Sequence, residues 1–249
     1  MLRVSVAEYG WRMAENEAHT AGPGETEIDP EVGSFRRMLR VHANDGLMAA
    51  AGIIQGLNTA GATGSEAFVA AVSTTVVGGL LIFGAEYGEA ASERDSQLAI
   101  IEAERRRVEM SPQEEYDELV DIYRRKGLSD RVAREVATEL NAKDALTAQL
   151  DAEYGIKEIG DIVRPMWVGR WSAAGFMVGS MIPWPFLLIV PVLTREIVLA
   201  VIVAVGLVVS AVTGARSDGS NVITSVVRTL GIGFGTMAIS LVAGSLVSF

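Results

Sequence analysis

The chain has 249 residues, of which 49% are hydrophobic and 21% charged, and its formal net charge is -10 at pH 7. This charge argues against nucleic-acid binding, which needs a basic face. The absence of cysteine excludes disulfides, thiolate metal sites and a cysteine nucleophile. Nearly all charges lie before Arg40 or between Glu86 and Arg170, and the remainder consists of long apolar runs. This segregation predicts a protein of the lipid bilayer rather than one with a large soluble core.

The N-terminal segment, residues 1–35, is polar and acidic over most of its length. It lacks the basic start and the apolar core that mark a secretory signal. We predict that it is a disordered or loosely helical leader on the cytoplasmic side of the membrane.

The apolar runs predict five membrane-spanning helices, since about 20 helical residues cross a bilayer. They cover residues 45–64, 67–91, 167–191, 197–213 and 222–247. The second helix meets no breaker and is expected to continue out of the membrane through Glu109. The predicted fold is all-α, a five-span transmembrane helical bundle with an inserted three-helix cytoplasmic domain. Its predicted divisions are the leader, two spans in residues 36–92, the insertion in residues 93–160, and three spans in residues 161–249.

The insertion is expected to contain the end of the second-span helix and two further amphipathic helices. Ser111 and Pro112 start one of them, because Ser caps helices and Pro suits the first turn. Gly127 ends that helix, and Ser129 caps the next, which is expected to continue to Gly155. Their apolar stripes must pack on each other or on a partner copy.

Basic residues predict the orientation, because Lys and Arg accumulate in cytoplasmic connections. They occur before the first span, in the insertion and in the fourth connection, as Arg36, Arg37, Arg40, Arg124, Arg125, Lys126, Arg216 and Arg228. The first connection and the C-terminal tail carry none, and the third connection carries only Arg195. We expect the N-terminus and the insertion inside and the C-terminus outside.

Small residues in the spans suggest close helix packing. Three glycine pairs have a four-residue spacing: Gly52/Gly56, Gly84/Gly88 and Gly175/Gly179. The first explanation is that they let helices of one subunit approach closely. A subunit interface in a dimer would need the same spacing.

Acidic residues near the membrane are the first functional candidates. Asp45 follows Asn44 at the entry of the first span, where it is either a helix cap or part of an ion path. Glu86 and Glu89 share a helical face near the end of the second span. They either gather a hard cation or are ordinary interfacial residues.

The insertion supplies a second set of candidates, because it is rich in glutamate. A charge run with interleaved Arg is usually a solvated helix face. Carboxylates from three packed helices can instead converge on an oxygen-ligated site for Mg, Ca, Mn or ferrous iron. Glu115 and Glu118, three residues apart, would form a natural ligand pair.

A series of short motifs runs along the chain in a defined order. They are Asn44-Asp45-Gly46-Leu47, Gly84-Ala85-Glu86-Tyr87, Ser92-Glu93-Arg94-Asp95, Ser111-Pro112, the turn from Tyr123 to Ser129, and Glu153-Tyr154-Gly155-Ile156. Their order, together with the five spans, resembles the vacuolar iron transporter family, bacterial branch, over about Arg36 to Phe249.

This resemblance implies a homodimer of five-span subunits in a bacterial cytoplasmic membrane. It implies transport of ferrous iron, or a similar divalent metal such as manganese, out of the cytosol in exchange for protons. The metal (Fe2+, with Mn2+, Co2+ and Zn2+ as alternatives) is then a substrate, no prosthetic group is needed, and the protein is not an enzyme. The carboxylate ligand positions of the family's cytoplasmic metal-binding domain match Glu104, Glu115, Glu118 and Glu153. The acidic residue that lines the path in the first span matches Asp45.

The chain departs from the family pattern at several positions. Arg107 stands where a second Glu is common, and Gln149 where a Met is found. Ile82 replaces a Met of the second span, and Thr74 replaces an acidic residue of eukaryotic members. Loss of a thioether removes a soft ligand that favours iron over harder ions. Two alternatives to transport therefore stay open: a membrane-anchored metal-binding or regulatory protein, and a structural membrane module.

Overall fold

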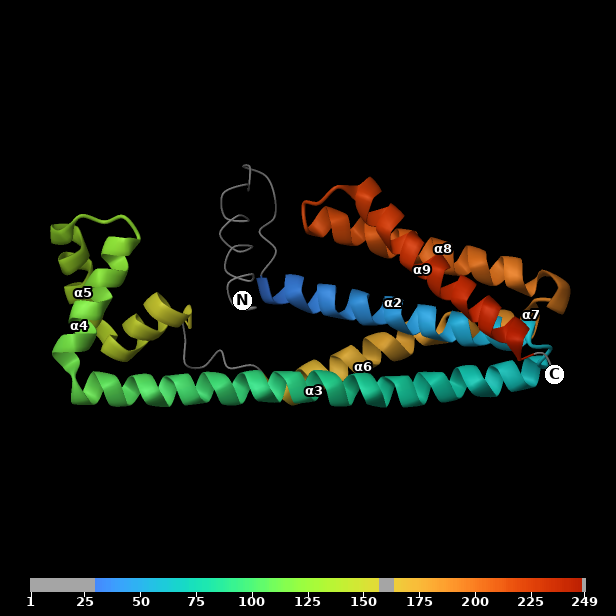
Figure 1. Ribbon diagram of the computed structural model, residues 1–249, viewed down its shortest axis with the longest axis horizontal. Coiled ribbons are helices and arrows are strands. Elements are labelled where there is room, and N and C mark those ends of the chain that lie inside the picture. Colours follow the sequence, from blue (N-terminus) through green and yellow to red (C-terminus); the bar gives the residue numbers. More distant parts are fainter. Residues whose placement is uncertain (1–29, 157–163, 248–249) are drawn as a thin grey trace. The chain divides into compact units, whose positions relative to one another are not determined.

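The computed structural model describes residues 30–156 and 164–247, and this part of the chain is helical, without strands (Figure 1). The all-α prediction is confirmed. The predicted leader lies outside the described residues as far as residue 29, and α2 begins at Pro30. The elements are α2 (Pro30–Thr59), α3 (Gly64–Met110), α4 (Pro112–Arg125), α5 (Asp130–Gln149), the π-helical turn η1 (Leu150–Tyr154), α6 (Pro165–Met181), α7 (Trp184–Ile189), α8 (Val192–Ser217) and α9 (Val222–Leu246).

Contacts along the chain separate two compact units. The first, here called the bundle unit, comprises Ile28–Ala90 and Pro165–Phe249. The second, here called the insertion unit, contains Ala91–Arg164. α3 passes from the bundle unit into the insertion unit, because the boundary falls within this helix.

α3 is a single helix of 47 residues. At about 1.5 Å per residue it is roughly 70 Å long, more than twice the ~30 Å hydrocarbon core of a bilayer. Its apolar first part therefore accounts for one span, and its charged second part, which includes Glu104, lies beyond that span. The expected continuation of the second span through Glu109 is confirmed, because α3 ends at Met110.

Three described helices are long and apolar enough to cross a membrane: α3, Thr194–Ser217 of α8, and α9. They coincide with the second, fourth and fifth predicted spans. α2 has sufficient length but carries His42, Asn44 and Asp45 near its middle, and these residues lower its hydropathy. The third predicted span is divided, because α6 ends at Met181 after 17 residues and Pro183 precedes the short α7. The count of five spans stays a prediction.

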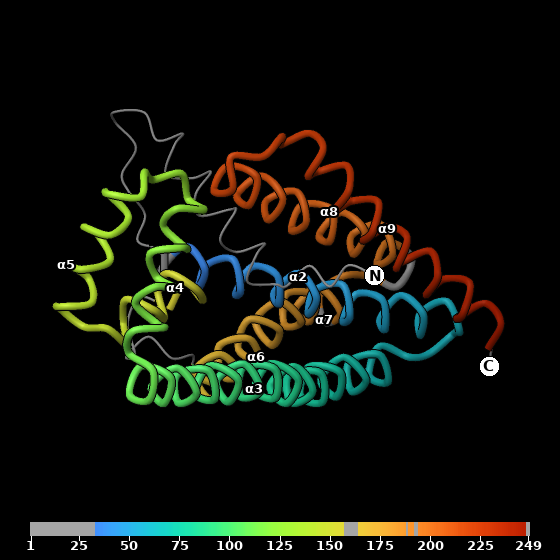
Figure 2. Tube along the Cα trace, turned by 60° about the vertical axis from the view of Figure 1, so that its left-hand side comes forward, coloured from blue at the N-terminus to red at the C-terminus, as the bar shows by residue number. Residues whose placement is uncertain are grey.

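α2 is the central helix of the bundle unit. It lies between α6 on one side and α8 and α9 on the other (Figures 1 and 2). Buried Leu47 and Ile54 of α2 pack with Val203 and Leu207 of α8 and with Met237 of α9. This apolar contact holds the helix that carries Asp45.

Two of the three glycine pairs pack within the bundle unit. They are Gly175/Gly179, against α2, and Gly52/Gly56, against Ser240 of α9. Close approach inside one subunit therefore explains both pairs. Gly84 and Gly88 of α3 differ, because an added Cβ on either would meet no described atom within 4 Å.

The insertion unit has a small apolar core between α4, α5 and η1. Leu119 and Val120 of α4 are buried there against Ala133 and Ala137 of α5. Pro112 opens α4, as predicted. Neither predicted serine cap forms a side-chain hydrogen bond to its helix.

The third helix of the insertion is not continuous to Gly155, so that prediction is wrong. α5 is interrupted at Asp144, whose backbone is extended. The Asp144 carboxylate accepts hydrogen bonds from the Thr147 backbone N at 3.1 Å and from the Thr147 hydroxyl at 2.7 Å. An aspartate in this arrangement caps a new helical start. The following turn, η1, ends at Gly155, which has a left-handed φ of 71°.

Candidate functional site

The insertion unit brings three of the predicted metal ligands together. Glu104 lies on α3, Glu115 on α4 and Glu153 on η1. The Glu104 side chain is fully buried, Glu115 is 7% exposed, and the Glu153 side chain is 29% exposed. Burial of carboxylates from three elements is costly unless a cation or a proton compensates their charge.

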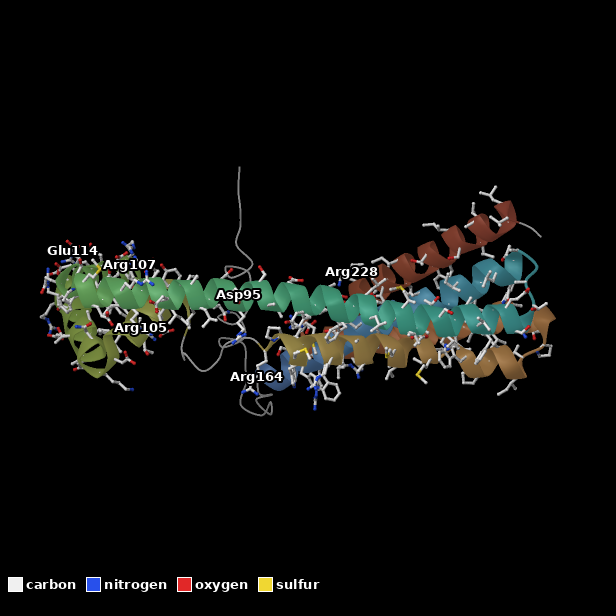
Figure 3. All side chains as sticks on the ribbon, turned by 90° about the horizontal axis from the view of Figure 1, so that it is seen from below. Asp95, Arg105, Arg107, Glu114, Arg164 and Arg228 are labelled. Carbon is white, nitrogen blue, oxygen red and sulfur yellow. The ribbon has the colours of Figure 1, made fainter. Side chains whose placement is uncertain are left out.

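Arg107 supplies the cation for this cluster. Its Nη2 pairs with the Glu104 carboxylate and lies 3.9 Å from Glu153 Oε2. The same nitrogen donates a hydrogen bond of 3.0 Å to the Tyr154 hydroxyl. Arg107 lies on α3 in the charged part of the chain (Figure 3). One guanidinium thus joins α3 to η1.

Gln149 adds a neutral hydrogen-bond donor to Glu115. Its Nε2 lies 3.2 Å from Glu115 Oε2 and also donates to the Glu115 carbonyl. Gln149 Oε1 and Glu104 Oε1 are buried and have no hydrogen-bond partner among the described residues. The cluster therefore keeps acceptor atoms that a proton or a cation could satisfy.

A proton on Glu104 is one way to satisfy these buried acceptor atoms. Burial, together with the nearby carboxyl groups of Glu115 and Glu153, raises the pKa of Glu104 to about 7, while the charge of Arg107 opposes the shift. Near neutral pH the Glu104 carboxyl can therefore carry a proton. Arg107 neutralises only part of the negative charge.

Glu118, the fourth predicted ligand, does not join the cluster. It is exposed on α4, while Glu115, one turn earlier, is buried. Within residues 30–156 and 164–247, no group of three or more His, Asp or Glu side chains is close enough to hold a metal ion in this arrangement. Glu104 and Glu153 therefore pair with Arg107, and Glu115 with Gln149, rather than forming a ligand cage.

Asp45 lies in the middle of α2, which begins at Pro30, so it is not a helix cap. Its Oδ2 is 3.8 Å from Nδ1 of His42, one turn earlier. The other ring nitrogen of His42, Nε2, is 3.4 Å from Glu86 Oε1 on α3. The predicted partner of Glu86 on the same helix, Glu89, is exposed and takes no part.

His42 was not among the residues predicted from the sequence to form the site. Its spacing of three residues from Asp45 places both on one face of a helix, and the chain has only two histidines. These two facts could have identified it. The contact with Glu86 could not be predicted, because it joins two helices.

Backbone contact between α2 and α6 fixes the position of this group. A Cβ built on Gly46 would overlap the Phe176 carbonyl, and a Cβ on Gly179 would overlap the Ala43 carbonyl. Asn44 Nδ2 also donates a 2.7 Å hydrogen bond to Ser210 Oγ of α8. The segment that carries His42 and Asp45 is thus held from two sides.

Thr74 and Ile82, the two second-span residues that depart from the family pattern, lie elsewhere in the bundle unit. Thr74 lines an apolar groove of about 530 Å³ together with Met48 and Gly52 of α2 and Ser240 of α9. Ile82 is partly buried on α3. The groove offers hydroxyl groups but no carboxylate.

Comparison with known proteins gives consistent matches. The model of the VIT family matches residues 41–245. The vacuolar iron transporter of Acanthamoeba castellanii (strain ATCC 30010 / Neff) is 31% identical to the chain over 189 residues, which cover 73% of this chain and 69% of that protein. The matched residues contain both the group around Asp45 and the carboxylate cluster of the insertion unit.

Proposed function

Because the chain belongs to the VIT family, we propose that it carries ferrous iron or a similar divalent metal, such as manganese, out of the cytosol in exchange for protons. The observation that carries this proposal is the contact of His42, Asp45 and Glu86 within the helix bundle. Ionisable groups in membrane helices are costly and mark ion paths. Transport makes and breaks no covalent bond, so no enzymatic activity is proposed.

The proposed topology has five spans, with α2 as the first and α6 with α7 as the third. Asp218 lies in the connection between α8 and α9, at one end of the bundle unit. Its Oδ1 is 3.2 Å from Arg37 Nη2, and its Oδ2 is 3.6 Å from Arg40 Nη2. These two basic segments therefore share one side, which the positive-inside rule assigns to the cytoplasm. We place this arrangement in a bacterial cytoplasmic membrane because of the bacterial-branch motifs.

Arg195 is consistent with this topology although it belongs to the opposite side. It is buried and donates hydrogen bonds to the carbonyls of Leu187 at 2.9 Å and Val190 at 3.3 Å. Its role is thus to satisfy the carbonyls at the end of α7 rather than to mark a cytoplasmic loop.

The insertion unit is proposed as the site where metal is loaded. Glu104, Glu115 and Glu153 would supply carboxylate oxygens, with Glu118 at the rim. Their origin on three elements supports a shared site, since a cation can draw such carboxylates together. Metal must then displace Arg107 from the cluster.

A homodimer is proposed on the exposed face of α3. Val76, Val77, Leu80 and Leu81 are each about half exposed or more. Gly84 continues this face with open space above it. In lipid, small residues beside an apolar face allow a second helix to approach closely.

Metal uptake into proteoliposomes tests the transport proposal. Purified full-length protein is expected to take up Fe2+ or Mn2+ into liposomes whose interior is more acidic than the medium, because protons leave as metal enters, and liposomes without protein provide the control. Binding without flux would favour the second candidate, a membrane-anchored metal-binding or regulatory protein. The pairing of Arg107 with the predicted ligands is the observation that favours this alternative.

A further inference from the structure

We propose that the His42 imidazole is a nitrogen ligand for the transported metal ion, acting together with the Asp45 carboxylate, and that Glu86 orients the ring. This inference rests on the proposed function, because it names a ligand on the same path. It concerns a residue outside the carboxylate set that the resemblance implied.

The first support is the state of the His42 ring. Its side chain is only 10% exposed, whereas the side chain of Asp45 is 46% exposed. His42 Nδ1 is buried and has no hydrogen-bond partner among the described residues. A buried nitrogen left in this condition costs free energy, so an unpartnered atom directed at a carboxylate calls for a bridging group.

The distance between the two groups fits a bridging ion. His42 Nδ1 and Asp45 Oδ2 are 3.8 Å apart, which is too long for a hydrogen bond. Metal–nitrogen and metal–oxygen bonds of about 2.0–2.2 Å place two ligand atoms of one ion up to ~4 Å apart. A divalent cation can therefore lie between the two atoms without movement of α2.

Glu86 lies beside the opposite edge of the ring. Its Oε1 approaches the opposite ring nitrogen, Nε2, at 3.4 Å. A metal-binding histidine usually donates its second N–H to a carboxylate, which fixes the tautomer and the ring orientation. With hydrogen on Nε2, the lone pair is on Nδ1 and faces Asp45. Because Glu86 lies on α3 and His42 on α2, the ring is held between two helices.

A nitrogen ligand also bears on metal preference. Imidazole suits iron, zinc, copper and nickel, while carboxylates and water alone suit Mg, Ca and Mn. His42 would thus restore part of the selectivity that the chain loses with Ile82. Two protein ligands leave the remaining positions to water. Weak, incomplete coordination suits an ion that must also leave its site.

Pulsed EPR of Mn2+ bound to the full-length protein tests this inference directly. Protein is prepared without a polyhistidine tag, once unlabelled and once with 15N-histidine, and the echo modulation from the ligand nitrogen is compared. The chain has only two histidines, so His19→Ala is the matched control. Modulation that changes with the isotope is expected in the wild type and in His19→Ala, and it should vanish in His42→Gln. Glu86→Gln should keep the modulation but weaken Mn2+ binding by about 10–100-fold.

Two results would overturn the inference: no histidine-dependent modulation in wild-type protein with Mn2+ bound, or modulation that persists in His42→Gln. The wild-type spectrum alone shows whether a histidine nitrogen binds Mn2+, even if the His42→Gln variant fails to fold. Mn2+ flux in proteoliposomes, measured in parallel, separates the two proposals. Flux without histidine modulation removes His42 as a ligand and leaves transport intact. Modulation without flux removes transport and leaves the ligand.

Discussion

At Arg107, a single guanidinium stands among carboxylates that would otherwise repel one another. It pairs with buried Glu104, approaches Glu153 and donates to Tyr154. An internal cation of this kind lets the insertion unit keep its fold without metal. The same cation opposes metal binding, because a divalent ion near Glu104 and Arg107 would meet like charge.

Replacing Arg107 with Glu is therefore expected to tighten divalent-metal binding, by about tenfold or ~1.4 kcal/mol. The variant adds a carboxylate and removes the competing cation. Calorimetric titration of full-length protein with Mn2+ or Co2+ measures the change. Arg105→Glu is the control, because Arg105 pairs only with Glu102 among the described residues, at 3.6 Å. Weaker binding in Arg107→Glu would show that metal does not enter this cluster.

Glu104 predicts a pH dependence of stability in metal-free protein. Burial raises its pKa from the ordinary 4.5 to about 7, so the folded state binds its proton more tightly than the unfolded state. Its stabilising contribution is complete below pH 4.5 and is lost as the pH rises through 7.

Glu104→Gln should remove this dependence and raise the melting temperature by several degrees at pH 8, since roughly 1 kcal/mol shifts a small domain by about 4–8 °C. Thermal unfolding at pH 5 and pH 8, with chelator present, provides the measurement. Exposed Glu118→Gln should leave the melting curves unchanged. A lower melting temperature for Glu104→Gln at pH 8 would contradict the assignment.

Among the elements, α2 and α6 cross with their backbones in contact, and this crossing sets the place of Asp45. Gly179→Val is expected to destabilise the protein by about 1–3 kcal/mol or more, because the side chain would enter the Ala43 carbonyl. Gly231→Val on α9 is the matched control, since a Cβ there meets open space. Equal melting temperatures for the two variants in detergent would contradict the close crossing.

Sequence patterns predicted elements better than they predicted contacts. The uninterrupted run of helix-compatible residues predicted a helix from residue 67 through Glu109, close to the observed bounds of α3, and Pro112 marked the start of α4. The break at Asp144 was missed, because an aspartate inside an amphipathic pattern does not show whether its carboxylate caps a turn. Of the four glutamates predicted to share a metal site, Glu104, Glu115 and Glu153 lie near one another and Glu118 does not, and metal binding there stays a prediction. The pairing of His42 with Glu86 arises only when α2 and α3 pack.

For the whole molecule, the proposed topology can be tested on a background that already lacks cysteine. Ala62→Cys lies in the connection between α2 and α3, and Ser220→Cys lies between α8 and α9. An impermeant maleimide added outside intact cells should label position 62 and not position 220. Disrupted cells should allow labelling of both. Labelling of both from outside intact cells would exclude the five-span arrangement.

Metal flux through Asp45→Asn tests the proposed ion path most directly. This change keeps the size of the side chain and removes the charge that compensates a cation leaving water. Exposed Glu89→Gln is the control. In proteoliposomes, Asp45→Asn is expected to lose nearly all Fe2+ or Mn2+ flux while its folding and oligomeric state match those of the wild type, and Glu89→Gln should transport normally. Normal flux through Asp45→Asn would contradict the proposed path.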